Sequence, residues 1–83
     1  MKYLVITMRR PNPPQDIIDA HYIYLEELRG QGKLDLWGPF TDKSGGAYVL
    51  EAADPAEAEA IVAADPIISS QTSDAQIREW NAR

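Results

Sequence analysis

A run of β-branched and aromatic residues, Lys2 to Met8, opens the chain and stops at Arg9-Arg10-Pro11-Asn12-Pro13-Pro14. Consecutive apolar side chains indicate a strand that is buried on both faces, and such strands lie at the centre of a sheet. The prolines that follow forbid continuation of the strand, because proline has no backbone N–H to donate. The sequence therefore predicts a sheet whose central strand comes first in the chain.

A helix is predicted after this strand and runs to about Arg29. Asn12 is a suitable N-cap, with Pro13 at the first helical position, and Gly30 and Gly32 supply the C-terminal stop. Apolar residues recur at the spacing of one helix face, at Ile17, Ile18, Leu25 and Leu28.

The second half of the chain predicts a hairpin, a helix and a last strand. Lys33 to Phe40 and Ala47 to Glu51 form the hairpin, with Leu34, Leu36 and Gly38 on one face of its first strand and Asp35, Trp37 and Pro39 on the other. Asp54-Pro55-Ala56-Glu57 resembles a capping box that opens a second helix. Pro66 interrupts that helix, and Ser73 to Trp80 is the last strand.

The order β-α-β-β-α-β is the split βαβ arrangement, an α+β fold in which two helices cover one face of an antiparallel sheet. The opposite sheet face has no cover within one chain. We expect Tyr3, Trp37, Tyr48 and Trp80 to leave an apolar patch there, which a second copy of the chain would bury. We therefore expect a homodimer.

Size and composition exclude several classes of protein. A chain of 83 residues is one domain, 1–83, with a small core, and without cysteine it has no disulfide or thiolate metal site to support that core. The net charge of −5 argues against nucleic-acid binding, and no apolar run approaches a membrane span. The opening residues Met1 to Ile6 are too short for a signal peptide, so we expect none, and no phosphate-binding or dinucleotide-binding glycine motif occurs. We expect a cytoplasmic protein that uses neither cofactor nor metal.

His21 is the only histidine, and it lies on the apolar face of the first predicted helix. One interpretation is a packed histidine whose nitrogens bond to backbone or water. The other is a half-buried imidazole that acts as a general base or acid, which requires a partner to orient it. The pattern of the helix leaves both interpretations open.

Asp65 is the candidate partner, because it continues the inner stripe of the second helix after Ile61 and Val62. An acidic side chain near a helix C-terminus needs a compensating cation or donor. However, Asp65-Pro66 has the same form as Asp54-Pro55, so Asp65 could instead cap the turn that follows. Both interpretations stay open.

Four further residues are candidates for binding a small-molecule ligand. Arg9 and Arg10 precede a helix N-terminus, where an anion is favoured, although arginines in loops are often only solvated. Gly38 and Pro39 end a strand, and the glycine lets a ligand approach closely. Tyr22 and Tyr24 flank His21 in sequence but point off its face, so we assign them to packing or to the surface.

Short motifs along the chain together resemble the YciI-like (YCII-related) family over Tyr3 to about Trp80. They are His21-x-x-x-Leu25-x-x-Leu28, Gly32-Lys33-Leu34, Gly38-Pro39-Phe40, Gly45-Gly46 and Ala64-Asp65-Pro66. The resemblance implies an architecture similar to muconolactone isomerase, a ferredoxin-like monomer that forms a dimeric α+β barrel. It also implies that His21 and Asp65 are the family's His-Asp active-site pair, in a cleft beside Gly38-Pro39.

One branch of that family resembles dehydrochlorinases that act on chlorinated hydroxyhydroquinones. This chain departs from the commoner pattern after Pro66, where Ile67-Ile68-Ser69-Ser70 replaces an aromatic residue followed by small ones. From the residues and the resemblance together we expect a lyase or isomerase that needs no cofactor and acts on a small anionic or aromatic compound. The alternative is a non-catalytic dimeric module that binds a small metabolite or accompanies a pathway enzyme.

Overall fold

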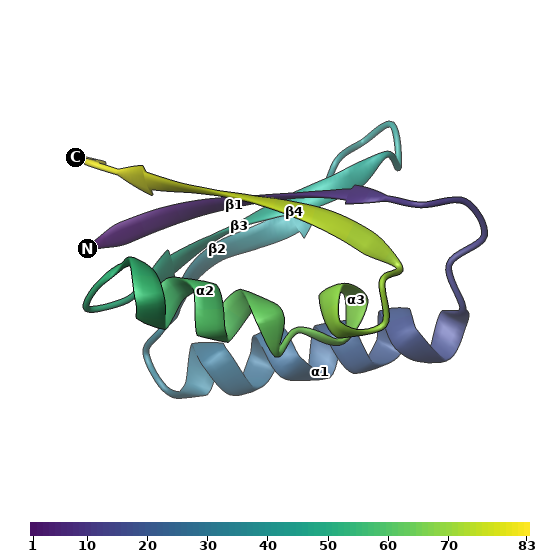
Figure 1. The fold of residues 1–83 in the computed structure, drawn as a ribbon, viewed down its shortest axis with the longest axis horizontal. Coiled ribbons are helices and arrows are strands. Elements are labelled where there is room, and N and C mark those ends of the chain that lie inside the picture. The colour runs from purple at the N-terminus through teal and green to yellow at the C-terminus, as the bar shows by residue number, and fades with distance from the viewer.

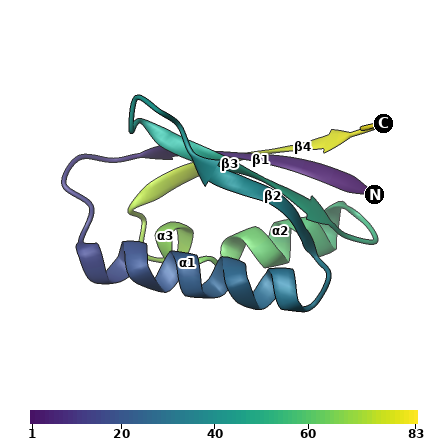
Figure 2. The same ribbon diagram turned by 180° about the vertical axis from the view of Figure 1, so that it is seen from behind.

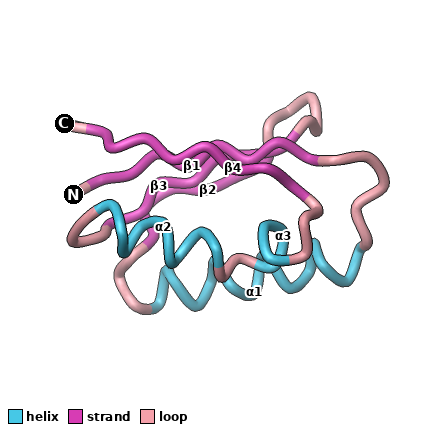
Figure 3. The backbone as a smooth tube through the Cα atoms, in the orientation of Figure 1, coloured by secondary structure: helices cyan, strands magenta, loops and turns pink.

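The computed structural model describes residues 1–83 as two layers, a four-stranded sheet and a layer of helices on one of its faces (Figures 1 and 2). The two layers are distinct in Figure 3, and both chain ends lie at the same end of the sheet. The strands are β1 (Lys2–Arg9), β2 (Leu34–Pro39), β3 (Gly45–Glu51) and β4 (Ser73–Trp80). The helices are α1 (Gln15–Gly30), α2 (Pro55–Ala63) and α3 (Pro66–Ser69).

The sheet has the order β2-β3-β1-β4, and every neighbouring pair is antiparallel. The predicted α+β fold of the split βαβ type is confirmed. The central place of β1 is confirmed as well, because β1 pairs with β3 on one side and with β4 on the other. β4 has the bounds that the sequence predicted.

The core lies between the sheet and the helices. Alternate residues of a strand point to opposite faces, so Tyr3, Val5 and Thr7 are buried under the helices while Leu4 and Ile6 lie half-exposed on the other side. The prediction that both faces of β1 are buried is therefore wrong within a single chain. Leu25, Leu28, Leu34, Leu50, Ile61 and Val62 also contribute to the core.

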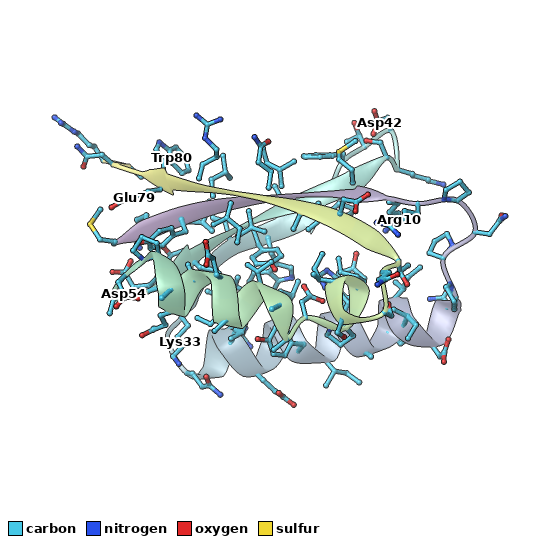
Figure 4. All side chains as sticks on the ribbon, in the orientation of Figure 1. Arg10, Lys33, Asp42, Asp54, Glu79 and Trp80 are labelled. Carbon is cyan, nitrogen blue, oxygen red and sulfur yellow. The ribbon has the colours of Figure 1, made fainter.

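The uncovered face of the sheet carries different residues from those expected. Tyr3 and Tyr48 lie on the covered face instead. A bulge between Leu34 and Trp37 shifts the register of β2. Because an extra residue reverses the alternation of side chains, Leu34 and Trp37 both lie on the covered face. Of the four aromatic residues, only Trp80 lies on the uncovered face, away from the helices (Figure 4).

α1 begins later than predicted. Asn12 is not the N-cap: its φ is +58°, Pro14 takes the cap position without a side-chain hydrogen bond, and the helix starts at Gln15. The physical reason is that a residue before proline avoids the α region, which prevents Pro13 from being helical. At the other end Gly32 adopts φ +74°, which favours glycine.

Two Asp-Pro steps begin the other helices. The Asp54 side chain accepts a hydrogen bond from the Glu57 backbone N–H at 2.8 Å, which confirms the predicted cap of α2. Asp65 caps α3 in the same way, and the interruption at Pro66 is confirmed. None of the helices is long and apolar enough to cross a membrane. The expected cytoplasmic location stays a prediction.

Candidate functional site

A cavity of about 30 Å³ opens where β1 ends and α1 begins, between the first turns of α1 and the β2–β3 end of the sheet. It is small and partly open, so a ligand seated there would extend past its mouth. Tyr22 and Trp37 line the cavity and are each 36% exposed. His21, Arg9, Gly38, Pro39, Tyr48, Ile67 and Ser73 are also among the lining residues.

His21 sits on the inner face of α1, one turn before Leu25, and its side chain is 13% exposed. Its Nδ1 lies 2.8 Å from Oδ1 and 2.9 Å from Oδ2 of Asp65. The ring is therefore packed and oriented by a carboxylate, while the residue still lines the cavity. The orienting partner that the catalytic interpretation requires is thus present, and the role of His21 as a general base or acid stays a prediction.

Asp65 lies between α2 and α3 and is completely buried. Besides the contacts to His21, its Oδ1 accepts a hydrogen bond from the Ile67 backbone N–H at 3.1 Å. The same carboxylate thus caps α3 and holds His21, which combines the two interpretations that the sequence left open. A buried charge is tolerated only when several donors surround it, and Asp65 meets that condition.

Tyr48 is a third member of this network, and the sequence analysis did not identify it as a site residue. Its hydroxyl donates a hydrogen bond to Oδ2 of Asp65 at 3.2 Å, and its ring centroid is 6.3 Å from that of His21. Burial, together with the neighbouring Asp65 charge, raises the pKa of the Tyr48 phenol. The phenol therefore stays protonated and remains a donor to Asp65 throughout the neutral range.

Sequence alone could not reveal this contact, because it depends on strand register. Tyr48 pairs with Val5 of β1, which places it on the covered face opposite α1. The alternation of β3 carried a weak signal, since Tyr48 and Leu50 are in phase. Nothing in the local sequence indicates that the Tyr48 hydroxyl reaches the start of α3.

The two arginines have different surroundings. Arg9 lines the cavity, and none of the ion pairs in the chain involves it. Arg10 lies outside the cavity, at the end of the sheet (Figure 4), where its guanidinium contacts Oδ1 of Asp74 at 2.6 Å. Gly38 and Pro39 line the cavity from β2.

The wall formed by β2 and β3 depends on close backbone approach. A β-carbon at Gly46 would lie 2.6 Å from the carbonyl oxygen of Gly38, and one at Gly45 would overlap the carbonyl oxygen of Thr7. A side chain at either position would push the strands apart. At Gly38 a β-carbon would meet nothing within 4 Å, so this glycine leaves open space.

No group of three or more histidine, aspartate or glutamate side chains is arranged to hold a metal ion. The chemically competent groups at the cavity are the imidazole of His21, the carboxylate behind it, the Tyr48 phenol and the Arg9 guanidinium. Together they can bind a small molecule and exchange a proton with it.

Comparison with known proteins agrees with this fold. The chain is 41% identical over 81 residues to the uncharacterized protein YjpA of Bacillus subtilis, covering 98% of this chain and 95% of YjpA. The structure of 5-chloro-2-hydroxyhydroquinone dehydrochlorinase (TftG) from Burkholderia phenoliruptrix AC1100, in complex with 2,5-dihydroxybenzoquinone, is similar with a TM-score of 0.79 and 26% identity. That match covers 98% of this chain and 94% of TftG.

More distant structures share the fold alone. An antibiotic biosynthesis monooxygenase matches with a TM-score of 0.61 at 13% identity, over 100% of this chain and 99% of its own. Rv0793 from Mycobacterium tuberculosis matches with a TM-score of 0.60 at 8% identity, over 100% and 98%. The YCII-related domain matches residues 1–81 of the sequence. The chain therefore belongs to the YCII-related family, as its motifs predicted.

Proposed function

We propose that this protein is a small enzyme that catalyses proton transfer on a small cyclic or aromatic compound, as a lyase or an isomerase, with no cofactor in the reaction. His21 acts as the general base and then as the general acid, and Asp65 orients it. The observation that carries the proposal is the contact of the His21 Nδ1 with both carboxylate oxygens of the fully buried Asp65. His21 itself lines the cavity.

The geometry supports this role through the second ring nitrogen. A carboxylate only accepts hydrogen bonds, so Nδ1 donates to Asp65 and the lone pair of a neutral ring is on Nε2. No hydrogen bond within the chain occupies Nε2. In the proposed reaction Nε2 takes a proton from the substrate, and Asp65 stabilises the imidazolium that forms. The imidazolium then returns the proton to another atom of the substrate or to its leaving group.

The comparison with TftG supports the class of compound. TftG is a dehydrochlorinase whose structure holds a dihydroxybenzoquinone. Loss of hydrogen chloride needs a base to remove the proton, and His21 offers one here. Tyr22 and Trp37 at the mouth of the cavity are suited to contact a planar ring.

The test measures chloride release from 5-chloro-2-hydroxyhydroquinone, together with deuterium uptake from D2O into related hydroxyhydroquinones. General acid–base catalysis contributes about 10²- to 10⁴-fold in rate, so His21→Ala should slow turnover at least about a hundredfold. Asp54→Ala is the matched control, because Asp54 caps a helix but lies outside the network. Equal rates for the native protein and His21→Ala would rule the proposal out. Binding of these compounds without turnover would instead identify the non-catalytic binding module.

We also propose that two chains associate through the uncovered face of the sheet. Leu4, Ile6 and Trp80 lie on this face, and Trp80 is 46% exposed (Figure 4). A face of this kind is costly to leave in water. We expect light scattering to give the mass of a dimer for the native protein and of a monomer for Ile6→Lys. A native protein that is monomeric at high concentration would contradict this arrangement.

A further inference from the structure

The cavity contains one permanently charged side chain. Seventeen residues line it, and among them Arg9 is the only arginine or lysine, with no aspartate or glutamate. The chain as a whole is acidic, with 13 Asp and Glu against 8 Lys and Arg. A cavity with a single cation and no carboxylate in its lining is therefore unlike the rest of the molecule, and it favours an anion.

Arg9 is also free to bind one. Its neighbour Arg10 is held by Asp74, and Arg29 is held by Glu26 at 2.9 Å, whereas Arg9 takes part in no ion pair. Arg9 is in phase with the buried residues Val5 and Thr7 along β1. The alternation of the strand thus brings Arg9 onto the covered face, where the cavity lies.

Ser73 supplies a second polar group at the same place. It is the register partner of Arg9 in the β1–β4 pair, it lines the cavity, and it is only 4% exposed. A hydroxyl beside a guanidinium can donate a hydrogen bond to an oxyanion that the guanidinium holds. The Thr7 hydroxyl is already engaged by the Gly46 carbonyl oxygen at 3.3 Å.

The two sides of the cavity differ in charge. The Asp65 carboxylate lies directly behind His21, so a negative group of the ligand is repelled on that side and attracted on the Arg9 side. We propose that the ligand of this site is a small planar monoanion whose charged oxygens bind Arg9 and Ser73 while its uncharged part faces His21. This inference rests on the proposed function for the identity of the site, and it adds the charge class and orientation of the substrate.

The test compares two probes of equal shape, benzoate and neutral benzamide, by calorimetric titration into the full chain. Benzoate should bind more tightly than benzamide. Arg9→Gln should lower the affinity for benzoate about tenfold or more, because a charge-assisted hydrogen bond is lost. The same variant should leave the affinity for benzamide unchanged. Arg10→Gln is the matched control and should alter neither probe, since Arg10 lies outside the cavity. Arg9→Lys keeps the charge and should recover part of the affinity.

A third probe, 2,5-dihydroxybenzoquinone, is ionised at neutral pH through oxygens attached directly to its carbon ring. If Arg9→Gln lowers the affinity for this probe more than the affinity for benzoate, the site is built for oxygens attached to a ring. The reverse order indicates a site built for a carboxylate. Benzoate affinity that is the same in Arg9→Gln and the native protein, equal binding of benzoate and benzamide, or binding of neither anion would overturn the inference. His21→Ala separates the two proposals, because it should slow turnover at least about a hundredfold and leave the Arg9-dependent binding in place.

Discussion

The contact between His21 and Asp65 predicts which nitrogen of the imidazole ring carries the proton. Nδ1 lies 2.8 Å and 2.9 Å from the two carboxylate oxygens, so the neutral ring must place its proton there. A hydrogen bond to a charged group contributes about 1.5–3 kcal/mol, which corresponds to a preference of about 10- to 150-fold. We expect about 90% or more of the molecules to carry the Nδ1–H tautomer at pH 9, where free imidazole is neutral.

Asp65→Asn should largely remove this preference. Ile67 N–H donates to Oδ1, so the amide oxygen of the variant should stay at that position and its NH2 group should take the position of Oδ2. There the amide can donate to the Tyr48 hydroxyl oxygen, which now accepts. Nδ1 is almost equidistant from both positions. It can then donate to the amide oxygen or accept from the amide NH2, and the two tautomers should become comparable in population.

Long-range ¹H–¹⁵N correlation spectra of the ring measure this directly, because protonated and bare ring nitrogens have separate ¹⁵N shifts. The chain has one histidine, so every ring signal belongs to His21. Asp54→Asn, at the other Asp-Pro cap, should leave the spectrum unchanged. A native protein that carries mainly Nε2–H at pH 9 would refute the reasoning, and so would an Asp65→Asn spectrum identical to that of the native protein.

Three further predictions concern stability. Gly45→Ala should lower the free energy of unfolding by several kcal/mol in urea titrations, because the added β-carbon overlaps a backbone carbonyl of β1. Gly38→Ala should change it by less than about 1 kcal/mol, because its β-carbon meets open space. Asp54→Ala should lower the free energy of unfolding by about 1 kcal/mol, because one helix cap is lost. Asp65→Ala should lower it by about 3 kcal/mol or more, because further buried donors lose their acceptor. Equal losses in the two variants would contradict the conclusion that Asp65 both caps α3 and holds His21. Burial beside a carboxylate raises the pKa of the Tyr48 phenol, so the unfolded chain ionises first. Stability should therefore fall as the pH rises above about 10, and Tyr48→Phe should show a shallower fall in thermal melts.

Much of the fold could be predicted because its main signals are local. Apolar runs, proline breaks and Asp-Pro caps lie in the sequence itself, and they located β1, β4 and the start of α2. The errors arose where an adjacent residue or a partner strand overrides the preference of a single residue or the alternation of a single strand. Adjacent prolines delayed the start of α1 to Gln15, and a bulge in β2 moved Trp37 to the covered face. A bulge depends on the partner strand, so no pattern within β2 alone reveals it.

The candidate site divides in the same way. Helix periodicity identified His21 and Asp65, and the structure brings their side chains together. The sequence could have distinguished Arg9 from Arg10, since Arg9 is in phase with the inward-facing residues of β1. Both arginines were instead predicted to bind the ligand. The Tyr48 contact was not available, because it joins the middle of β3 to a helix cap through tertiary packing.

The pairing of β1 with β4 has a consequence for how the chain folds. These are the first and last strands, and they pair from Lys2–Trp80 to Arg9–Ser73 along their whole length. Contacts so distant in sequence are slow to form because a long loop must close first. During synthesis one edge of β1 therefore stays unpaired until residues 73–80 have left the ribosome, and an unpaired strand edge favours aggregation. Molecules truncated before Ser73 should accumulate as insoluble protein, and the cavity should be among the last parts of the molecule to form.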